Sequence, residues 1–382
     1  MFEFATATRI VFGAGRYADA AGIVAGLGVT RALVVTGKRT ALGDRLVAQL
    51  ATDHGIAAVG FAVEGEPTVE VAREGVLAGE GCDGVIAVGG GAALDAGKAI
   101  AALLANGGDP LDYLEVIGRG HPLRRPALPF VAVPTTAGTG SEVTRNAVLG
   151  DKASGVKASL RSAGMLPAVA LVDPDLLVGL PAPVLASCGM DALAQVIEPF
   201  LCARANPVTD ALAREGITRS ARSLARAYAG EMGPAEREDL ALTSLFGGMC
   251  LANSGLGAVH GFAAPIGGSW PAPHGAVCAA LLPAVLEANH RALLARAPEH
   301  PSLARFEELA ARMVGPGATV GELFAAVEAL RVAVRIPGLS AYGVRTADLP
   351  GLVPRGKAAS SMKANPIPLT DAELIGILER AL

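Results

Sequence analysis

The chain has 382 residues, 51% of them hydrophobic and 18% charged, which is enough for about two or three domains with large apolar cores. A formal net charge of −4 excludes the strongly basic surface of a nucleic-acid-binding protein and offers no polybasic anchor for a membrane. Residues 1–15 lack a signal-peptide pattern, no uncharged apolar run approaches the roughly 20 residues of a membrane span, and the five cysteines form no C-x-x-C pair. We therefore expect a cytoplasmic protein with reduced thiols and no membrane partner.

The first half of the chain alternates strand-like and helix-like segments. Nearly continuous apolar runs predict strands at 31–36, 84–90, 129–136 and 168–174, as in a parallel sheet that is covered on both faces. Segments with a helical pattern lie between them. This alternation predicts an α/β domain whose ligand binds at the carboxyl ends of the strands.

The second half of the chain is predicted to be all-helical. Strand signals stop at about residue 179, and the segments beyond it have helical patterns. Two of these helices begin with capping-box pairs, at 319–322 and 370–373. We therefore predict an α/β domain over 1–179 and a helical domain over 180–382.

An early glycine loop, Gly13-x-Gly15-x-x-Ala18, imitates a dinucleotide-binding fingerprint. That fingerprint also needs an acidic residue at the end of the next strand, and here the next strand ends in "VVTGKRT". The sequence therefore favours a tight structural turn at this point.

The segment "VIAVGGGAALDAGKAIA" (85–101) is a stronger candidate for a phosphate loop. Gly89, Gly90 and Gly91 follow a buried strand and open a helix, where free backbone N–H groups and the helix dipole attract phosphate. Asp95 and Lys98 lie in the first turns of that helix. The alternative interpretation is a helix start that packs closely on its strand.

A second polar loop, "VPTTAGTGSEVT" (133–144), also follows a strand. Its hydroxyl groups come from Thr135, Thr136, Thr139 and Ser141. Such a density of donors suits phosphate and ribose oxygens. The alternative interpretation is an ordinary polar loop.

The segment "GMDALAQVIEPF" (189–200) is predicted to be a helix with one polar face. Asp191, Gln195 and Glu198 share that face, and taken alone the pattern predicts a solvated surface. Two of the six histidines, His260 in "GAVHGF" and His274 in "APHGAV", lie in small-residue segments that we expect to be loops.

Several motifs together resemble the iron-containing (group III) alcohol dehydrogenase family, which shares its fold with dehydroquinate synthase. The resemblance covers nearly the whole chain and is most specific in "GGGAALDAGK", "PTTAGTGSEVT", "GMDALAQVIEP", "AVHGFAAPIGG", "PAPHG" and "KANPIPLT". It implies an α/β dinucleotide-binding domain, an all-α domain that holds a divalent metal, and a cofactor in the cleft. It also implies hydride transfer between NAD(P)(H) and a small alcohol or aldehyde by at least a homodimer.

The resemblance implies metal ligands from one aspartate and three histidines. Asp191, His260 and His274 match, Gln195 stands at the remaining histidine position, and Ala264 replaces a further family histidine near the nicotinamide. An amide oxygen is a poorer ligand for Fe²⁺ or Zn²⁺ than imidazole. We expect a metal site of reduced affinity, with Gln195 as a weak fourth ligand or a supporting group. The open alternative is a metal-free site in which Gln195 donates a hydrogen bond to the substrate carbonyl.

The cofactor preference is predicted from the end of the strand at 31–36. The family often carries an aspartate there, whereas this chain has Gly37 followed by Lys38 and Arg39. Loss of the acid and gain of cations favour the 2′-phosphate of NADP(H) over NAD(H). The alternative is a basic surface turn. Lys157 matches a family lysine expected near the cofactor.

The leading functional prediction is a metal-assisted alcohol dehydrogenase or aldehyde reductase, and no catalytic residue beyond the ligands is assigned. Gln195 and Ala264 leave two alternatives open: a metal-independent reductase of the maleylacetate reductase type, or a cofactor-binding relative with a decayed site. A dehydroquinate-synthase-like lyase is disfavoured, because the helical half shows no cluster of basic residues around the ligands. The sequence does not reveal the substrate.

Overall fold

The computed structural model describes residues 1–151, 153 and 155–382. The chain divides into an α/β unit, Ala5–Thr136 with Gly140–Val178, and a helical unit, Met1–Phe4 with Ala137–Thr139 and Gly179–Leu382. Residues 1–4 and 137–139 are predicted to belong to the α/β domain, but the structure groups them with the helices. Close packing accounts for the second segment, since a Cβ atom at Gly138 would lie 2.9 Å from Cβ of Cys188.

A parallel six-stranded sheet forms the centre of the α/β unit. Its strands lie in the order β1 (Arg9–Phe12), β8 (Val169–Val172), β5 (Phe130–Pro134), β4 (Gly84–Gly89), β2 (Arg31–Thr36) and β3 (Ala57–Ala62). The four predicted strands are confirmed, and β1 and β3 add one strand at each edge. All strands point the same way, so their carboxyl ends meet at one edge of the sheet.

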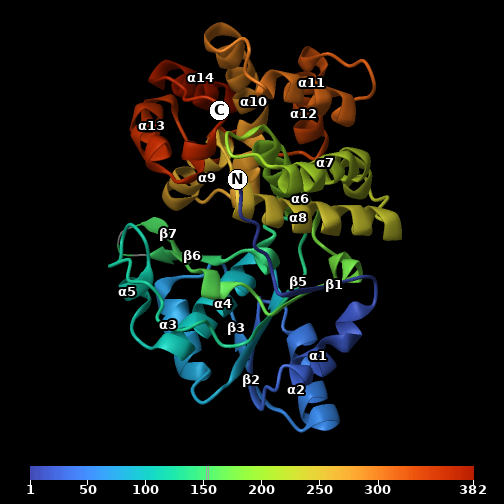
Figure 1. Cartoon of the computed structure of the whole chain (residues 1–382), viewed down its shortest axis with the longest axis vertical. Helices are drawn as coiled ribbons and strands as arrows, with labels where there is room; N and C mark the ends of the chain where they lie inside the picture. Colours follow the sequence, from blue (N-terminus) through green and yellow to red (C-terminus); the bar gives the residue numbers. More distant parts are fainter. Residues whose placement is uncertain (152, 154) are drawn as a thin grey trace. The chain divides into compact units, whose positions relative to one another are not determined.

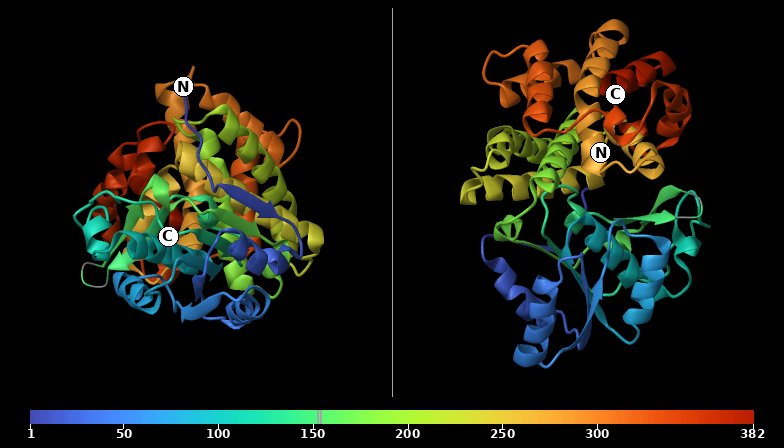
Figure 2. Two further views of the ribbon diagram at one scale, coloured as in Figure 1. Left: turned by 60° about the horizontal axis from the view of Figure 1, so that its bottom comes forward. Right: turned by 180° about the vertical axis from the view of Figure 1, so that it is seen from behind.

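Helices cover both faces of this sheet, as Figures 1 and 2 show. Side chains alternate along each strand, so Val34 packs into a core with α1 and α2, whereas Leu33 packs into a core with α3 and α4. These helices span Ala20–Gly26 (α1), Ala41–His54 (α2), Val69–Ala78 (α3) and Gly91–Asn106 (α4). Double-sided burial explains why the strands are apolar at nearly every position.

Shorter elements complete the α/β unit. They are η1 (Arg16–Asp19), α5 (Pro110–Tyr113), η2 (Ser141–Val143), η3 (Ala163–Met165), η4 (Pro174–Leu177) and the antiparallel hairpin of β6 (Asn146–Asp151) and β7 (Val156–Arg161). The early glycine loop is a turn tied to the end of β8, because the Asp173 carboxylate accepts hydrogen bonds from the backbone N–H groups of Gly15 and Tyr17.

The helical unit shows no strand in its described residues, which confirms the all-helical prediction. Its α-helices are α6 (Ala182–Leu201), α7 (Pro207–Tyr228), α8 (Pro234–Ser254), α9 (Ala258–Ser269), α10 (His274–Arg296), α11 (Ser302–Met313), α12 (Val320–Ala333), α13 (Leu349–Ala358) and α14 (Asp371–Ala381). Short 3₁₀ turns η5 (Leu339–Tyr342), η6 (Thr346–Asp348) and η7 (Ser361–Ala364) join the last of them. Both predicted capping boxes are present, at the starts of α12 and α14.

Two helices of this unit, α6 and α10, are long and apolar enough to cross a membrane by length and composition, and α8 with α9 would add a third candidate if that bent pair were one span. Neither helix contains an uncharged apolar run of about 20 residues, so neither is predicted as a span from such runs alone. Within the unit, 83% of the apolar window of α6 and 72% of that of α10 is buried. Their apolar side chains pack against α7, α8, α9, α12 and α14. These residues therefore form the core of the helical unit.

Candidate metal centre

Four side chains from three helices of the helical unit converge on one point. They are Asp191 on α6, His260 on α9, and His274 with Cys278 on α10, and one ligating atom of each lies within 4.8 Å of the others. Asp191 Oδ1 lies 3.3 Å from Nε2 of His260 and 3.8 Å from Nε2 of His274. The Cys278 sulfur lies 3.7 Å from each of these two nitrogen atoms.

Both histidines lie in the first turn of a helix, so the predicted loops are wrong. Gly257 and Pro273 occupy the N-cap positions, which makes His260 the third residue of α9 and His274 the first residue of α10. Small residues and proline favour such helix starts, and a sequence pattern of short apolar residues does not distinguish them from loops. In α10, Cys278 follows His274 by one turn and therefore shares its face.

The polar face of α6 is buried, which corrects the expected solvated surface. Asp191 and Gln195 are each only 2% exposed, and Glu198 is 6% exposed. Helical periodicity identifies the face correctly but cannot show that α9 and α10 cover it. Buried polar groups need partners, so each of these side chains must be satisfied within the unit.

Glu198 orients the imidazole of His260. Its Oε2 atom lies 2.6 Å from Nδ1 of His260, and Oε1 accepts a hydrogen bond of 2.8 Å from the backbone N–H of Val259. The carboxylate holds a ring proton on Nδ1, so Nε2, which faces Asp191, is the nitrogen left to bind a metal. Histidines that bind metals usually donate their second ring N–H to such a carboxylate.

Gln195 has one satisfied end and one unsatisfied end. Its Nε2 group donates a hydrogen bond of 3.3 Å to the carbonyl oxygen of Gly138. Its Oε1 atom is buried and has no hydrogen-bond partner among the described residues. A buried carbonyl oxygen without a donor is a candidate acceptor for a cation or for a substrate hydroxyl group.

The cluster attracts positive charge. Burial lowers the pKa of His260, but the Cys278 sulfur and the Asp191 and Glu198 carboxylates more than offset this effect, so the pKa lies well above its ordinary value. Burial also lowers the pKa of His274, yet Cys278 and Asp191 raise it to about 9. Burial raises the pKa of Asp191, but both imidazoles outweigh it and hold that pKa below its ordinary value. A divalent cation would supply the same compensating charge.

The distances fit a tetrahedral metal ion. With metal–ligand bonds of about 2.0–2.3 Å, the corners of a tetrahedron lie about 3.3–3.8 Å apart. The separations of Asp191 Oδ1 from the two Nε2 atoms, 3.3 Å and 3.8 Å, and of the Cys278 sulfur from the same atoms, 3.7 Å each, lie in this range, and all four ligating atoms lie within 4.8 Å of one another. The side chain of His274 is 39% exposed, which leaves one side of the cluster open to a small molecule.

Sequence reasoning missed Cys278 as a member of this cluster. The family motif "PAPHG" ends at residue 275, and the cysteine was considered only as a scattered thiol. A signal was present, because His274 and Cys278 have the spacing of one helical turn. That spacing becomes informative only when α10 is known to begin at His274.

In the α/β unit, the structure brings together part of the predicted phosphate loop. A Cβ atom at Gly89 would lie 3.2 Å from the backbone nitrogen of Gly37, and one at Gly90 would lie 3.2 Å from Thr136. The backbone N–H of Thr135 donates to the carbonyl of Gly89 at 2.9 Å. Thus β2, β4 and β5 present these residues side by side at their carboxyl ends, where parallel sheets bind nucleotides.

Two further residues predicted to bind cofactor contact each other. The hydroxyl group of Ser141 donates to Asp95 at 2.5 Å, and Asp95 also accepts the backbone N–H of Val148. The buried Lys98 ammonium donates to the Ser141 carbonyl at 3.0 Å and to Thr144 at 2.9 Å. These contacts fasten residues 141–148 to α4.

The remaining predicted cofactor residues are dispersed. Gly91 is the first residue of α4, and Lys38 is exposed beyond the end of β2. Thr139 belongs to the helical unit, and Lys157 lies on β7, where it forms an ion pair of 3.4 Å with Glu66.

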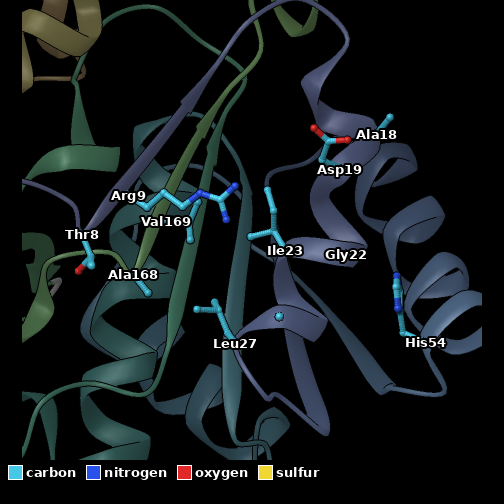
Figure 3. A pocket seen from close by; sticks show the side chains of 11 residues that line it. Thr8, Arg9, Ala18, Asp19, Gly22, Ile23, Leu27, His54, Ala168 and Val169 are labelled. Atoms are coloured by element: carbon cyan, nitrogen blue, oxygen red, sulfur yellow. The ribbon is translucent and has the colours of Figure 1, made fainter.

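A separate pocket lies on the α/β unit, at the opposite ends of the strands. Figure 3 shows Arg9 from β1 and Ile23 from α1 among the side chains that line it, together with Ala168 and Val169 at the start of β8. None of the predicted cofactor residues lines it. Its place at the amino ends of β1 and β8 separates it from the glycine loop.

Comparisons with known proteins show the family to which this chain belongs. The family model "Iron-containing alcohol dehydrogenase" matches residues 7–174, and "Fe-containing alcohol dehydrogenase family, C-terminal" matches residues 185–382. The 1,3-propanediol dehydrogenase of Citrobacter freundii is 36% identical over 363 residues, which cover 93% of this chain and 92% of that protein.

Solved structures have the same fold. A 1,3-propanediol oxidoreductase superposes with a TM-score of 0.91 at 34% identity and covers 100% of both chains. The sulfoacetaldehyde reductase from Bifidobacterium kashiwanohense in complex with NAD⁺ gives a TM-score of 0.88 at 27% identity, over 100% of this chain and 98% of that one. The chain belongs to the iron-containing alcohol dehydrogenase family, and it is an NAD(P)-dependent oxidoreductase that acts on alcohols and aldehydes.

Proposed function

We propose that this enzyme interconverts a small alcohol and its aldehyde with NADP(H), at a divalent metal held by Asp191, His260 and His274. The observation that carries the proposal is the convergence of these three side chains, with separations that suit a tetrahedral metal ion. Fe²⁺ and Zn²⁺ are the candidate metals, because both accept imidazole and carboxylate ligands.

When bound, the metal supplies Lewis acidity that polarises an aldehyde carbonyl or lowers the pKa of an alcohol. Asp191, His260 and His274 would hold it, and Glu198 keeps the Nε2 atom of His260 directed toward it through the hydrogen bond at Nδ1. The partly exposed His274 marks the open side of the site, where a small substrate enters.

Proton transfer needs a carrier other than a side chain at position 264. The family resemblance implies a histidine there, and Ala264 is an exposed alanine one turn after His260. Its exposure gives water access to this face of α9. We therefore assign the proton relay to solvent or to a ribose hydroxyl group of the cofactor.

The preference for NADP(H) rests on the end of β2. Position 37, directly after β2, is a glycine and therefore has no acidic side chain. The exposed Lys38 and Arg39 follow it directly. The test is kcat/KM for NADPH and NADH with the same aldehyde, in the wild type and in Gly37→Asp. We expect higher kcat/KM with NADPH in the wild type and a shift toward NADH in the variant. A clear NADH preference of the wild type would refute this part of the proposal. Both cofactors must be compared, because one relative of this chain, the sulfoacetaldehyde reductase, was solved with NAD⁺.

The metal is tested by elemental analysis of gently purified protein, followed by activity before and after chelation. We expect bound divalent metal, loss of activity with the chelator, and recovery when metal is returned. His274→Ala should bind less metal. Purified protein that contains no metal and is equally active with and without the chelator would contradict the proposal.

That negative result would favour the metal-free alternative, which the unsatisfied Oε1 atom of Gln195 keeps open. In that case Gln195→Ala would reduce kcat without any change in metal content. Gln195→His provides the opposite test, because an imidazole there should tighten metal binding if the site is a weakened metal site.

Two remaining expectations belong to the same proposal. The family resemblance predicts at least a homodimer, which sedimentation measurements would test. Localisation in the cytoplasm follows from the scattered reduced cysteines and is tested by cell fractionation.

A further inference from the structure

We propose that the thiolate of Cys278 is the fourth protein ligand of this metal, and that the resulting Asp-His-His-Cys set selects zinc over iron. The inference deepens the proposed function and depends on its metal site. Neither the family motifs nor the sequence pattern assigns a role to this cysteine.

The position of the Cys278 sulfur suits a zinc ligand. Cys278 Sγ lies 3.7 Å from Nε2 of His260 and 3.7 Å from Nε2 of His274. A zinc ion about 2.3 Å from sulfur and about 2.0–2.1 Å from each nitrogen, at the tetrahedral angle, requires S···N separations of about 3.6 Å. The sulfur therefore already occupies a corner of the required tetrahedron, on the same helix face as His274.

The contacts of Cys278 differ from those of other buried cysteines in the helical unit. Cys202 donates its thiol to the carbonyl oxygen of Ser254 at 3.4 Å, and Cys250 donates to the carbonyl of Thr209 at 3.3 Å. Cys278 is fully buried as well, yet the contacts of its sulfur are two imidazole nitrogens instead of a backbone carbonyl. A thiol beside the metal-facing nitrogens of two histidines is placed to bind a cation.

Gln195 is held in place beside the cluster. Its amide N–H group is already bound to the Gly138 carbonyl, and a Cβ atom at Gly247 would lie 3.0 Å from its Cβ, so its stem is tightly packed. Gln195 then acts as a neighbour of the ligand set, and its free oxygen remains available to a substrate hydroxyl group. Metal selectivity follows, because a soft thiolate favours zinc more than it favours isolated ferrous iron.

The test uses cobalt(II) as a spectroscopic substitute for zinc in the full-length protein. A cysteine ligand gives a thiolate-to-cobalt charge-transfer band in the near-ultraviolet. We expect this band in the wild type, in Gln195→Ala and in Cys82→Ser, which makes the same thiol-to-hydroxyl change in the α/β unit. We expect Cys278→Ser to lose the band and to bind zinc at least ~100-fold more weakly, beyond the ~10–100-fold typical of a group that only supports a ligand.

A measurement without any variant covers the case in which Cys278→Ser fails to fold. X-ray absorption at the zinc edge of the wild type should show one sulfur neighbour at about 2.3 Å. A zinc shell of nitrogen and oxygen alone, or a charge-transfer band that persists in folded Cys278→Ser, would overturn the inference while leaving the proposed metal site intact. A wild type that binds neither cobalt nor zinc would instead overturn the metal site itself.

Discussion

Replacing Glu198 by glutamine tests how far metal affinity depends on a residue that does not touch the metal. The carboxylate accepts three hydrogen bonds, from the backbone N–H groups of Val259 and His260 and from Nδ1 of His260. Glutamine has only one oxygen, so its amide N–H₂ must face one of these donors. If the amide N–H₂ faces Val259, the buried backbone N–H of Val259 loses its acceptor, which costs about 1–3 kcal/mol of folding free energy.

The other orientation changes the chemistry of the ligand. An amide N–H₂ that faces His260 donates to Nδ1 and forces the ring proton onto Nε2, the atom that faces Asp191. A protonated Nε2 cannot bind a metal. Loss of such a supporting carboxylate typically reduces metal affinity ~10–100-fold. This range corresponds to about 1.4–2.7 kcal/mol of binding free energy.

The assay is a competitive zinc titration at neutral pH, with thermal unfolding of the metal-free proteins measured in parallel. Glu236→Gln is a matched control in the same unit, because Glu236 contacts Gly233 and Arg226 instead of the cluster. We expect weakened zinc binding only in Glu198→Gln, and partial recovery in Glu198→Asp. Wild-type zinc affinity in a folded Glu198→Gln protein would refute the assigned role of this carboxylate.

Three further substitutions test the α/β unit. Gly89→Ala places a Cβ atom 2.6 Å from Cβ of Ala93 and should reduce the free energy of unfolding in urea by about 1–3 kcal/mol. Gly60→Ala is the control, because no atom lies within 4 Å of the added Cβ, and it should not cause this loss. Equal effects of the two substitutions would contradict the close packing at Gly89. Asp173→Ala removes the buried acceptor of three backbone N–H groups and should cost about 1–3 kcal/mol or more in the same measurement, so an unchanged midpoint would contradict its role. Burial raises the pKa of Glu142 from 4.5 to about 7, so the folded protein binds this proton more tightly than the unfolded chain does. This proton's contribution to the free energy of unfolding is fully present below pH 4.5 and is lost as the pH rises through 7. Glu142→Gln should therefore gain stability relative to the wild type between pH 5 and pH 8, and a pH-independent difference would exclude this titration.

Much of the fold is predictable from local patterns. The buried strands β2, β4, β5 and β8 have continuous apolar runs because helices cover both faces of the sheet. The edge strand β3, "AAVGFA", mixes alanine and glycine and gives no such run. The β6–β7 hairpin is also missed, although buried Ala158 and Leu160 alternate with polar residues along β7, because such a six-residue pattern is short and the β6 partner contains a glycine.

The metal centre was predictable only in part. Asp191, His260 and His274 follow from the family motifs, and Glu198 follows from helical spacing. Cys278 and the burial of the α6 polar face do not, because both depend on how three helices that are distant in sequence pack together. Tertiary packing thus determines which polar residues become ligands.

The segment Ala137–Thr139 restricts how the chain can be divided into independent fragments. It leaves the α/β unit for three residues and supplies the carbonyl of Gly138 that Gln195 binds. A fragment that begins at Gly179 therefore lacks a piece of its own interior, although it contains every residue of the metal cluster. Exchange of nucleotide-binding halves between relatives would need to retain residues 137–139 of the recipient, so the natural unit of recombination in this fold is discontinuous in sequence.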